Sequence, residues 1–252
     1  MSMTAGLKEI IRTMSTEVKI RCGACVPSID LDVLGKTMVI APHPDDEVLG
    51  CGGLIARLVN KGNAPHIAIL TSGEGSHRGC CRTSEDDIVV SRRKLAFTAA
   101  GTLGAPAGNY HFIGLPDGSI PGKDDESKQV KILRNLILDL NPDTVFVPHW
   151  GEGWPDHLNA ARLVRSILRE EGHQPSVYEY AVWMWYYFVW RLDWRNAVQL
   201  KMRDSEYHLK CRAVDEYVIP QAPCGRPWSG VLPDLFISAN KRSREIYFKT
   251  IL

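Results

Sequence analysis

The sequence of 252 residues has no long hydrophobic run and no excess of charge of one sign. No apolar stretch reaches the roughly 18 residues needed to span a bilayer, and the amino-terminal segment lacks the apolar region of a secretory signal. Lys and Arg number 30 against 29 Asp and Glu, so the formal net charge of +1 gives no field that would attract nucleic acid. We therefore expect a cytoplasmic protein with no integral membrane segment and no nucleic-acid partner.

A disulfide framework is also lacking. The chain has seven cysteines at irregular spacings: Cys22, Cys25, Cys51, Cys80, Cys81, Cys211 and Cys224. An odd number at irregular spacing favours reduced thiols. The C-x-x-C pair at residues 22–25 has no second pair, so it is weak evidence for a metal or redox site.

Short apolar segments alternate with amphipathic ones after a polar helical leader. Strands are expected at 37–42, 66–73, 110–116, 143–150 and 176–183, and helices at 45–62, 84–104, 126–140 and 155–172. This alternation predicts an α/β fold in which helices flank a doubly wound, mostly parallel sheet. The alternation is lost after about residue 184. We expect one domain over 1–252, with 171–252 as its carboxy-terminal extension and a last strand and helix within 232–252.

The segment VIAPHPDDEVLGCGG, residues 39–53, places a histidine, a proline and three carboxylates directly after an apolar strand. Asp45, Asp46 and Glu47 would suit the first turn of a helix through its dipole alone. The glycines that follow each cost about 1 kcal/mol relative to alanine inside a helix, which indicates close packing of this helix against a strand or a ligand. These glycines are Gly50, Gly52 and Gly53.

A cation explains this junction better than a phosphate. The G-x-G-x-x-G spacing is absent, and three carboxylates would repel a pyrophosphate. His43 and Asp46 lie three residues apart around a turn, and His157 follows another predicted strand in PHWGEGWPDH, residues 148–157. Since the carboxyl ends of parallel strands share one edge of the sheet, the three side chains should meet there. Two imidazoles and one carboxylate leave coordination positions open, as a hydrolytic zinc requires.

APHPDDEVLGCGG with a later PDH closely resembles the LmbE-like, or PIG-L-like, N-acetylglucosaminyl deacetylases, a family of zinc-dependent amide hydrolases with a Rossmann-like fold. TSGEGS (71–76), the segment 92–105, GLPDG (114–118) and the segment 145–164 match the later blocks of the family in order and spacing, so that the resemblance covers about residues 37–170. It implies removal of the N-acetyl or N-acyl group from a GlcNAc-type sugar or glycoconjugate. The implied cofactor is Zn²⁺, with another divalent transition metal such as Fe²⁺ as an alternative.

The resemblance implies His43, Asp46 and His157 as metal ligands and Asp45 as the general base that takes a proton from water. Arg92 and Asp117 would bind sugar hydroxyls. Two simpler interpretations stay open, because an arginine on a helix is often solvated and PDG is a common turn sequence. The family often has a glutamate three residues after this arginine, where the chain has Leu95.

The match breaks at Trp154, where much of the family has a histidine that stabilises the oxyanion or protonates the leaving amine. An indole N–H donates a hydrogen bond but delivers no proton at neutral pH. His149, at the same strand end, is our first candidate for the acid. Asp45, after it has accepted a proton, is the second.

The segment VWMWYYFVWRLDW, residues 182–194, is rich in aromatic side chains. It serves either as core, as a wall that stacks on a sugar or an aglycone, or as an oligomer surface. Five histidines have no partner at metal-ligand spacing and are assigned structural roles: His66, His77, His111, His173 and His208.

The sequence therefore predicts a zinc-dependent deacetylase with a small-molecule amino-sugar or glycoconjugate substrate, and it is compatible with a homo-oligomer. Two alternatives remain. One is an amidase of a sugar-thiol conjugate or of another N-acyl amine. The other is a sugar-binding protein that has lost turnover through Trp154.

Overall fold

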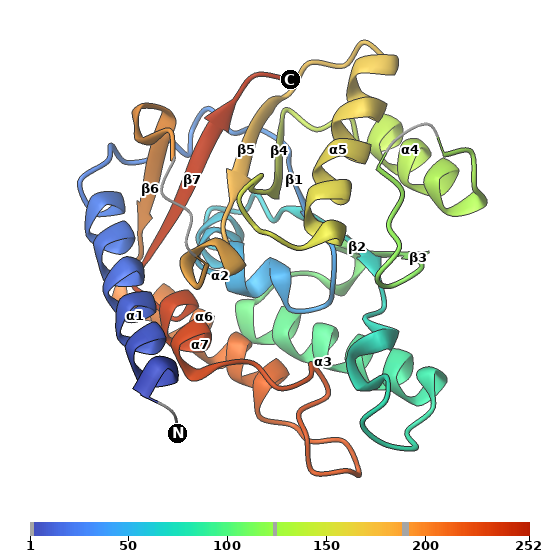
Figure 1. The fold of residues 1–252 in the computed structure, drawn as a ribbon. Coiled ribbons are helices and arrows are strands. Elements are labelled where there is room, and N and C mark those ends of the chain that lie inside the picture. Colours follow the sequence, from blue (N-terminus) through green and yellow to red (C-terminus); the bar gives the residue numbers. More distant parts are fainter. Residues whose placement is uncertain (1–2, 123–124, 188–191) are drawn as a thin grey trace.

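A mixed sheet crosses the computed structural model, which describes residues 3–122, 125–187 and 192–252 (Figure 1). Within these residues the sheet has seven strands in the order β3-β2-β1-β4-β5-β7-β6. Neighbouring strands from β3 to β5 are parallel, whereas β7 is antiparallel to both β5 and β6. The strands are β1 Thr37–Ala41, β2 His66–Thr71, β3 Tyr110–Leu115, β4 Thr144–Pro148, β5 Ser176–Tyr180, β6 Ala197–Lys201 and β7 Arg244–Thr250.

Helices cover both faces of this sheet. The α-helices are α1 Met3–Gly23, α2 Asp46–Asn60, α3 Glu85–Leu103, α4 Lys128–Leu140, α5 Pro155–Glu170, α6 Asp204–Val218 and α7 Asp234–Asn240. Short 3₁₀ turns are η1 Glu74–His77, η2 Ala107–Asn109, η3 Trp183–Trp185 and η4 Trp194–Asn196. Helices α2, α3 and α6 pack together on one face, and α4 and α5 cover the other (Figure 1).

The central strands are buried on both faces. Val39 and Ala41 of β1 belong to the core under α2, α3 and α6, whereas Met38 and Ile40 belong to the core under α4 and α5. This burial explains why the strands read as continuous apolar runs rather than as alternating patterns. The predicted α/β class and its mostly parallel sheet are confirmed.

Most of the predicted elements are present, but three strands end at least two residues earlier than expected: β2 at Thr71, β4 at Pro148 and β5 at Tyr180. After β5 the backbone N–H groups of Val182 and Trp183 bond to the Glu152 side chain instead of to a strand. After β4 the His149 N–H still bonds to the Tyr180 carbonyl, but the Gly151 N–H bonds to the His149 side chain. The predicted last strand and helix correspond to β7 and α7, in the order helix then strand. Strand β6 and helix α6 were not predicted.

The glycines of α2 allow this helix to approach the sheet closely. A Cβ atom at Gly50 would lie 2.2 Å from Cδ2 of Tyr180 in β5, and one at Gly53 would lie 2.3 Å from Sδ of Met202. Real Cβ atoms do not reach such distances, so alanine at either position would displace a neighbour. The expected close packing of this helix against a strand is confirmed.

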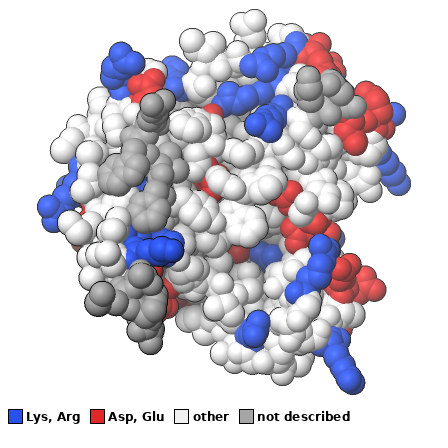
Figure 2. Space-filling model, viewed as in Figure 1, with Lys and Arg blue, Asp and Glu red and all other residues white. Residues whose placement is uncertain are grey.

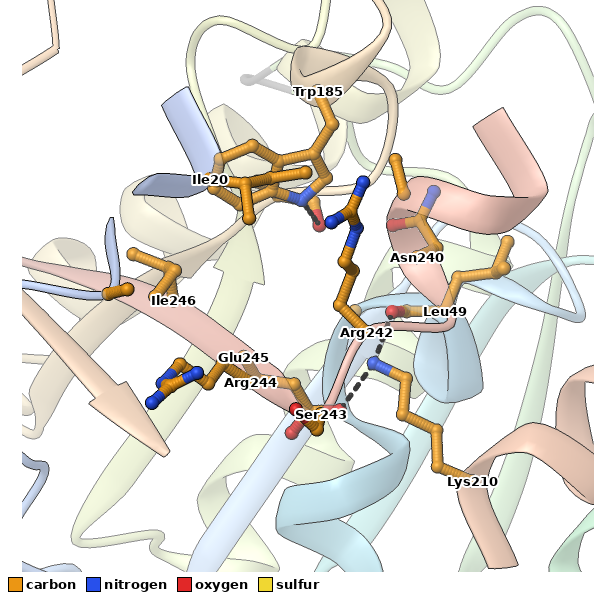
Figure 3. Close-up of a pocket in the computed structure, with 14 residues that line it drawn as sticks. Ile20, Leu49, Trp185, Lys210, Asn240, Arg242, Ser243, Arg244, Glu245 and Ile246 are labelled. Atoms are coloured by element: carbon orange, nitrogen blue, oxygen red, sulfur yellow. Dashed lines mark hydrogen bonds and ion pairs between the residues drawn. The ribbon is translucent and has the colours of Figure 1, made fainter. Parts of the chain in front are cut away.

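A buried ion pair joins the carboxy-terminal segment to α2 (Figure 3). Lys210 Nζ of α6 lies 2.7 Å from Glu245 Oε1 of β7 and donates to the Leu49 carbonyl at 3.0 Å. Glu245 also accepts the backbone N–H groups of Gly53 and Leu54 at 2.7 and 2.8 Å. The pair borders a cavity of about 160 Å³. Residues of α6 and β7 thereby fix the position of α2.

Charged side chains of both signs are interspersed around a mostly uncharged centre on the face drawn in Figure 2. Among the described residues, no helix has the length and apolar character needed to cross a membrane.

Candidate active site

The predicted metal ligands lie where the strand order of the sheet reverses, between β1 and β4. His43 follows β1, Asp46 is the first residue of α2, and His157 lies in the first turn of α5, directly beyond β4. Open α/β sheets bind ligands at such a switch point, beyond the carboxyl ends of the strands. A cavity of about 430 Å³ opens there, and these three side chains line it together with Asp45.

Asp46 stands between the two imidazoles. Its Oδ2 lies 3.2 Å from His43 Nδ1 and 3.3 Å from His157 Nε2. The three ligand atoms lie within 4.8 Å of one another, so these residues could hold a metal ion. The donors are those that zinc and other divalent transition metals accept, and an incomplete set of three leaves room for water or substrate.

Opposite charges stabilise one another in this cluster. Burial alone would lower the pKa of His157, but the carboxylates of Asp46 and Glu152 outweigh burial and raise that pKa to about 9. Burial would raise the pKa of Asp46, but the imidazoles of His157 and His43 hold it well below its usual range. The residues therefore concentrate negative charge where the two rings converge, which is the environment that a divalent cation would meet.

Glu152 is a functional candidate that the sequence analysis missed. It is fully buried, and its Oε2 lies 3.1 Å from His157 Nδ1, although the two atoms are not aligned as a hydrogen bond. It also accepts the backbone N–H groups of Val182, Trp183 and Met184 at 2.8, 2.8 and 3.2 Å. A carboxylate behind a metal-ligating histidine fixes the orientation of its ring. The available signal was an acid five residues before His157 in a loop that follows a strand.

Asp156 was missed as well. Its Oδ2 lies 3.3 Å from His43 Nε2, and Oδ1 of the predicted Asp117 lies 3.1 Å from the same nitrogen. His43, Asp117 and Asp156 thus form a second set of possible ligands. The backbone N–H groups of Gly118 and Ile120 already occupy both carboxylate oxygens of Asp156, at 2.7 and 3.1 Å. The set that contains Asp46 is therefore the better metal site.

Asp45 adopts a strained backbone conformation at the start of α2. Its φ of 135° is rare for a residue with a side chain, and its N–H donates to Glu47 Oε2 at 3.0 Å. Burial raises the pKa of Asp45 to about 7, although the nearby guanidinium of Arg92 lowers it. A carboxyl group with a pKa near neutrality is suited both to accept and to return a proton.

Arg92 is buried, so the alternative of a solvated arginine is wrong. Its guanidinium donates to the carbonyl groups of Pro44 at 2.5 Å and Gly73 at 3.2 Å, and lies 3.1 Å from Asp45 Oδ2. It joins the loops after β1 and β2 beneath the cavity that it lines. Sugar binding by Arg92 and Asp117 stays a prediction.

His149 lies outside the residues that line the cavity. Its Nδ1 accepts the Gly151 N–H at 2.9 Å, its Nε2 lies 3.6 Å from Glu179 Oε2, and its ring packs against Phe248. Burial lowers the pKa of His149 to about 3. The structure therefore gives no support to His149 as the acid, because its ring is directed toward β5 and β7.

Aromatic side chains form one wall of the cavity. Trp154 is 44% exposed, and its ring centroid lies 5.5 Å from that of Trp183, which in turn lies 4.1 Å from that of Phe236. The aromatic segment is thus divided, since Trp183 faces the cavity whereas Trp185 is buried in the core. Residues 188–191 of this segment lie outside the described residues.

The assignment of His77 as a histidine without metal-spaced partners is wrong. Its Nδ1 lies 3.3 Å from Sγ of Cys80, 3.6 Å from Sγ of Cys81 and 3.5 Å from Sγ of Cys224. The cysteine that completes this group comes from a distant part of the chain, which the spacing within the 72–83 loop does not reveal.

Comparison with known proteins finds a matching family model and related enzymes. The family model for GlcNAc-PI de-N-acetylase (PIG-L) matches residues 38–168, slightly more than half of the chain. The chain is 27% identical over 158 residues to 2'-N-acetylparomamine deacetylase of Streptomyces fradiae, an alignment that covers 58% of this chain and 56% of the relative. It is 29% identical over 155 residues to 1D-myo-inositol 2-acetamido-2-deoxy-alpha-D-glucopyranoside deacetylase of Nocardia farcinica, covering 54% and 52%.

Solved structures show the same fold. N,N'-diacetylchitobiose deacetylase of Pyrococcus horikoshii superposes with a TM-score of 0.57 at 20% identity, over 75% of this chain and 73% of that chain. The chain spans about half the length of the two curated relatives named above.

Proposed function

Because the chain belongs to the PIG-L family of GlcNAc-PI de-N-acetylases, we propose that it is a zinc-dependent hydrolase that removes the N-acetyl or N-acyl group of a GlcNAc-type sugar or glycoconjugate. The observation that carries this proposal is the convergence of His43, Asp46 and His157 beside Asp45 in one cavity. The curated relatives named above, both deacetylases of amino-sugar compounds, support the substrate class.

The residues fit the metal. His43, Asp46 and His157 would hold Zn²⁺, which lowers the pKa of water and polarises an amide carbonyl. Glu152 orients His157 from behind, and the carboxylates of Asp117 and Asp156 do the same for His43. The role of the protein is to present these ligands in a fixed arrangement with room for a substrate.

Asp45 carries the proton transfer. As a carboxylate it accepts a proton from the attacking water, and as a carboxylic acid it returns that proton to the nitrogen of the departing amine. The pKa of about 7 makes both protonation states accessible near neutral pH. Asp45 therefore takes the acid role as well, since Trp154 delivers no proton and His149 does not line the cavity.

The aromatic wall binds the sugar. Trp154 and Trp183 expose apolar ring surface to the cavity, whereas Asp117 and Arg92 line it with polar groups. An apolar face opposite a few fixed polar groups is typical of a small-molecule site. We assign the tryptophans to ring stacking against the sugar or its aglycone, and Asp117 to its hydroxyl groups.

The test is acetate release from a panel of N-acetylated amino sugars and glycoconjugates by the zinc-loaded protein. Asp45→Asn should lower kcat by about 10² to 10⁴ while zinc stays bound, and metal-stripped wild type should be inactive until zinc is restored. Turnover only with other N-acyl amines would favour the amidase alternative. Sugar binding without acetate release on any substrate, with zinc bound at His43, Asp46 and His157, would contradict the proposal and favour the binding protein.

A further inference from the structure

A second group of metal-binding side chains lies outside the catalytic cavity. His77, Cys80 and Cys81 belong to the segment that begins with η1 after β2, and Cys224 belongs to the loop between α6 and α7. The two segments are separated by more than a hundred residues, yet their ligand atoms lie within 4.8 Å of one another. The mechanism proposed above uses none of these four residues.

His77 is oriented as a metal ligand. Its Nε2 lies 3.0 Å from the Pro227 carbonyl, so this nitrogen carries the proton and donates it. The lone pair is then on Nδ1, which faces the three sulfur atoms at 3.3 to 3.6 Å. A backbone carbonyl that fixes the tautomer in this way is the usual partner of a metal-ligating histidine.

From this arrangement we propose that His77, Cys80, Cys81 and Cys224 bind a structural zinc ion. Three thiolates and one imidazole are a Cys₃His set, and four protein ligands close the tetrahedral shell with no position for water or substrate. The His₂Asp set near Asp46 differs, since it leaves positions open. The three cysteines of the new group are free of disulfides, and the exposed Cys224 offers an entry path for the ion.

The position of this site indicates what it does. Ser76, next to His77, donates from Oγ to the Trp228 carbonyl at 3.0 Å, so the two loops already touch beside the ligands. Gly75 and Ser76 from one loop and Ser229 from the other line the catalytic cavity. A zinc ion that joins the loops would therefore hold one wall of the substrate site in place, at a distance from the reacting atoms.

The proposal is tested by loading the 252-residue protein with Co²⁺ and recording its absorption spectrum. Cobalt in a tetrahedral site with thiolate ligands gives an intense near-ultraviolet charge-transfer band, whereas the His₂Asp set contains no sulfur. The band is expected in wild type and in Asp46→Ala, and should be weakened or lost in Cys224→Ser, which removes one of the three thiolates. Cys211→Ser is the matched control, because Cys211 is also a free cysteine but lies outside the group, and it should keep the band.

Zinc content gives a second readout that does not depend on activity. Cys224→Ser should lose about one equivalent of zinc relative to wild type and Cys211→Ser. If Cys224→Ser fails to fold, His77→Cys keeps four ligands, and it should retain zinc and a cobalt band with altered energy. Absence of the charge-transfer band in wild type would overturn the proposal. A disulfide between two of Cys80, Cys81 and Cys224, found by peptide mapping of unreduced protein, would also overturn it.

Discussion

Glu152 lies behind the candidate metal ligands and connects His157 to the loop after β5. Glu152→Gln would keep one acceptor oxygen and the size of the side chain, but it would remove the negative charge beside His157 Nδ1. We expect zinc affinity to fall about 10- to 100-fold, because a carboxylate behind a ligating histidine strengthens its metal bond. Competition with a chelator measures this affinity. The control is Glu170→Gln, a surface glutamate paired with Arg134, and equal affinity of the two variants would contradict the role of Glu152.

His149 makes the stability of the protein depend on pH. Its pKa is lowered by burial to about 3, so the unfolded chain binds a proton below about pH 6.5 that the folded chain excludes. This contribution to stability is complete above the unfolded pKa and is lost as the pH falls. Between about pH 7.5 and about pH 5 the loss is about 2 kcal/mol.

His149→Asn removes the titrating group while its Oδ1 can still accept the Gly151 N–H. Urea unfolding of both proteins at the two pH values should show a smaller loss of unfolding free energy in the variant, by about 2 kcal/mol. Since His149 does not line the cavity, the rate of acetate release by the His149→Asn variant should stay within a few-fold of the wild-type rate. An equal pH dependence of stability in both proteins would contradict this account.

The convergence of the candidate metal ligands was predictable from sequence, because each lies near a junction between a strand and a helix. His43 and Asp46 follow β1, and His157 lies at the start of the helix that follows β4, so their convergence follows from the parallel sheet. Glu152 is held in place by three backbone N–H groups about 30 residues further along the chain. No local sequence pattern reveals such a contact. Cys224 approaches His77 across 147 residues of chain.

At the scale of elements, alanine substitutions of glycine distinguish the effect of helix propensity on stability from the effect of packing. Gly50→Ala would gain about 1 kcal/mol in propensity, but its Cβ would meet Tyr180, and such overpacking costs about 1–3 kcal/mol. We expect a lower free energy of unfolding. Gly101→Ala, in α3, is the matched control, because a Cβ atom there would have no neighbouring side chain within 4 Å, and it should stabilise the protein by about 0.5–1 kcal/mol.

Urea unfolding of the two glycine variants shows whether the gain in helix propensity or the cost of overpacking is larger at Gly50. Stabilisation by both alanines would show that the helix can move away from β5 at little cost. The close contact between α2 and β5 would then not be the reason for the glycines in α2. The observed positions of the two backbones would not be affected by this result.

The parallel half of the sheet could be predicted because its strands are buried on both faces and read as apolar runs. β6 could not, since Val198 and Gln199 are only partly buried and Lys201 is exposed, which weakens the apolar signal of this edge strand. α6 was missed for a related reason. One of the side chains that it buries under α2 is a charged one, Lys210, which a hydrophobic pattern counts as surface.

At the scale of the whole molecule, the polar contacts around Glu245 decide whether residues 171–252 unfold with the rest. Lys210 of α6 and Glu245 of β7 are both buried, and together they bond to the backbone of α2, beside the candidate metal ligands. The candidate metal ligand Asp46 thus belongs to α2, a helix whose position depends on contacts with the carboxy-terminal segment. This connection supports the prediction of one domain over residues 1–252.

Lys210→Met tests that prediction, because it leaves Glu245 buried without its counter-charge. Removal of one partner of a buried ion pair costs about 3–5 kcal/mol, whereas Lys131→Met, which breaks an exposed pair with Glu126, should change stability by no more than about 0.5 kcal/mol. If the chain is one cooperative unit, urea unfolding followed by helical circular dichroism and by release of the zinc ion at His43, Asp46 and His157 should give one coincident transition. In Lys210→Met both probes should shift together to lower urea. Loss of helical signal in this variant at urea concentrations where zinc stays bound would instead mean that the carboxy-terminal segment unfolds as a separate unit.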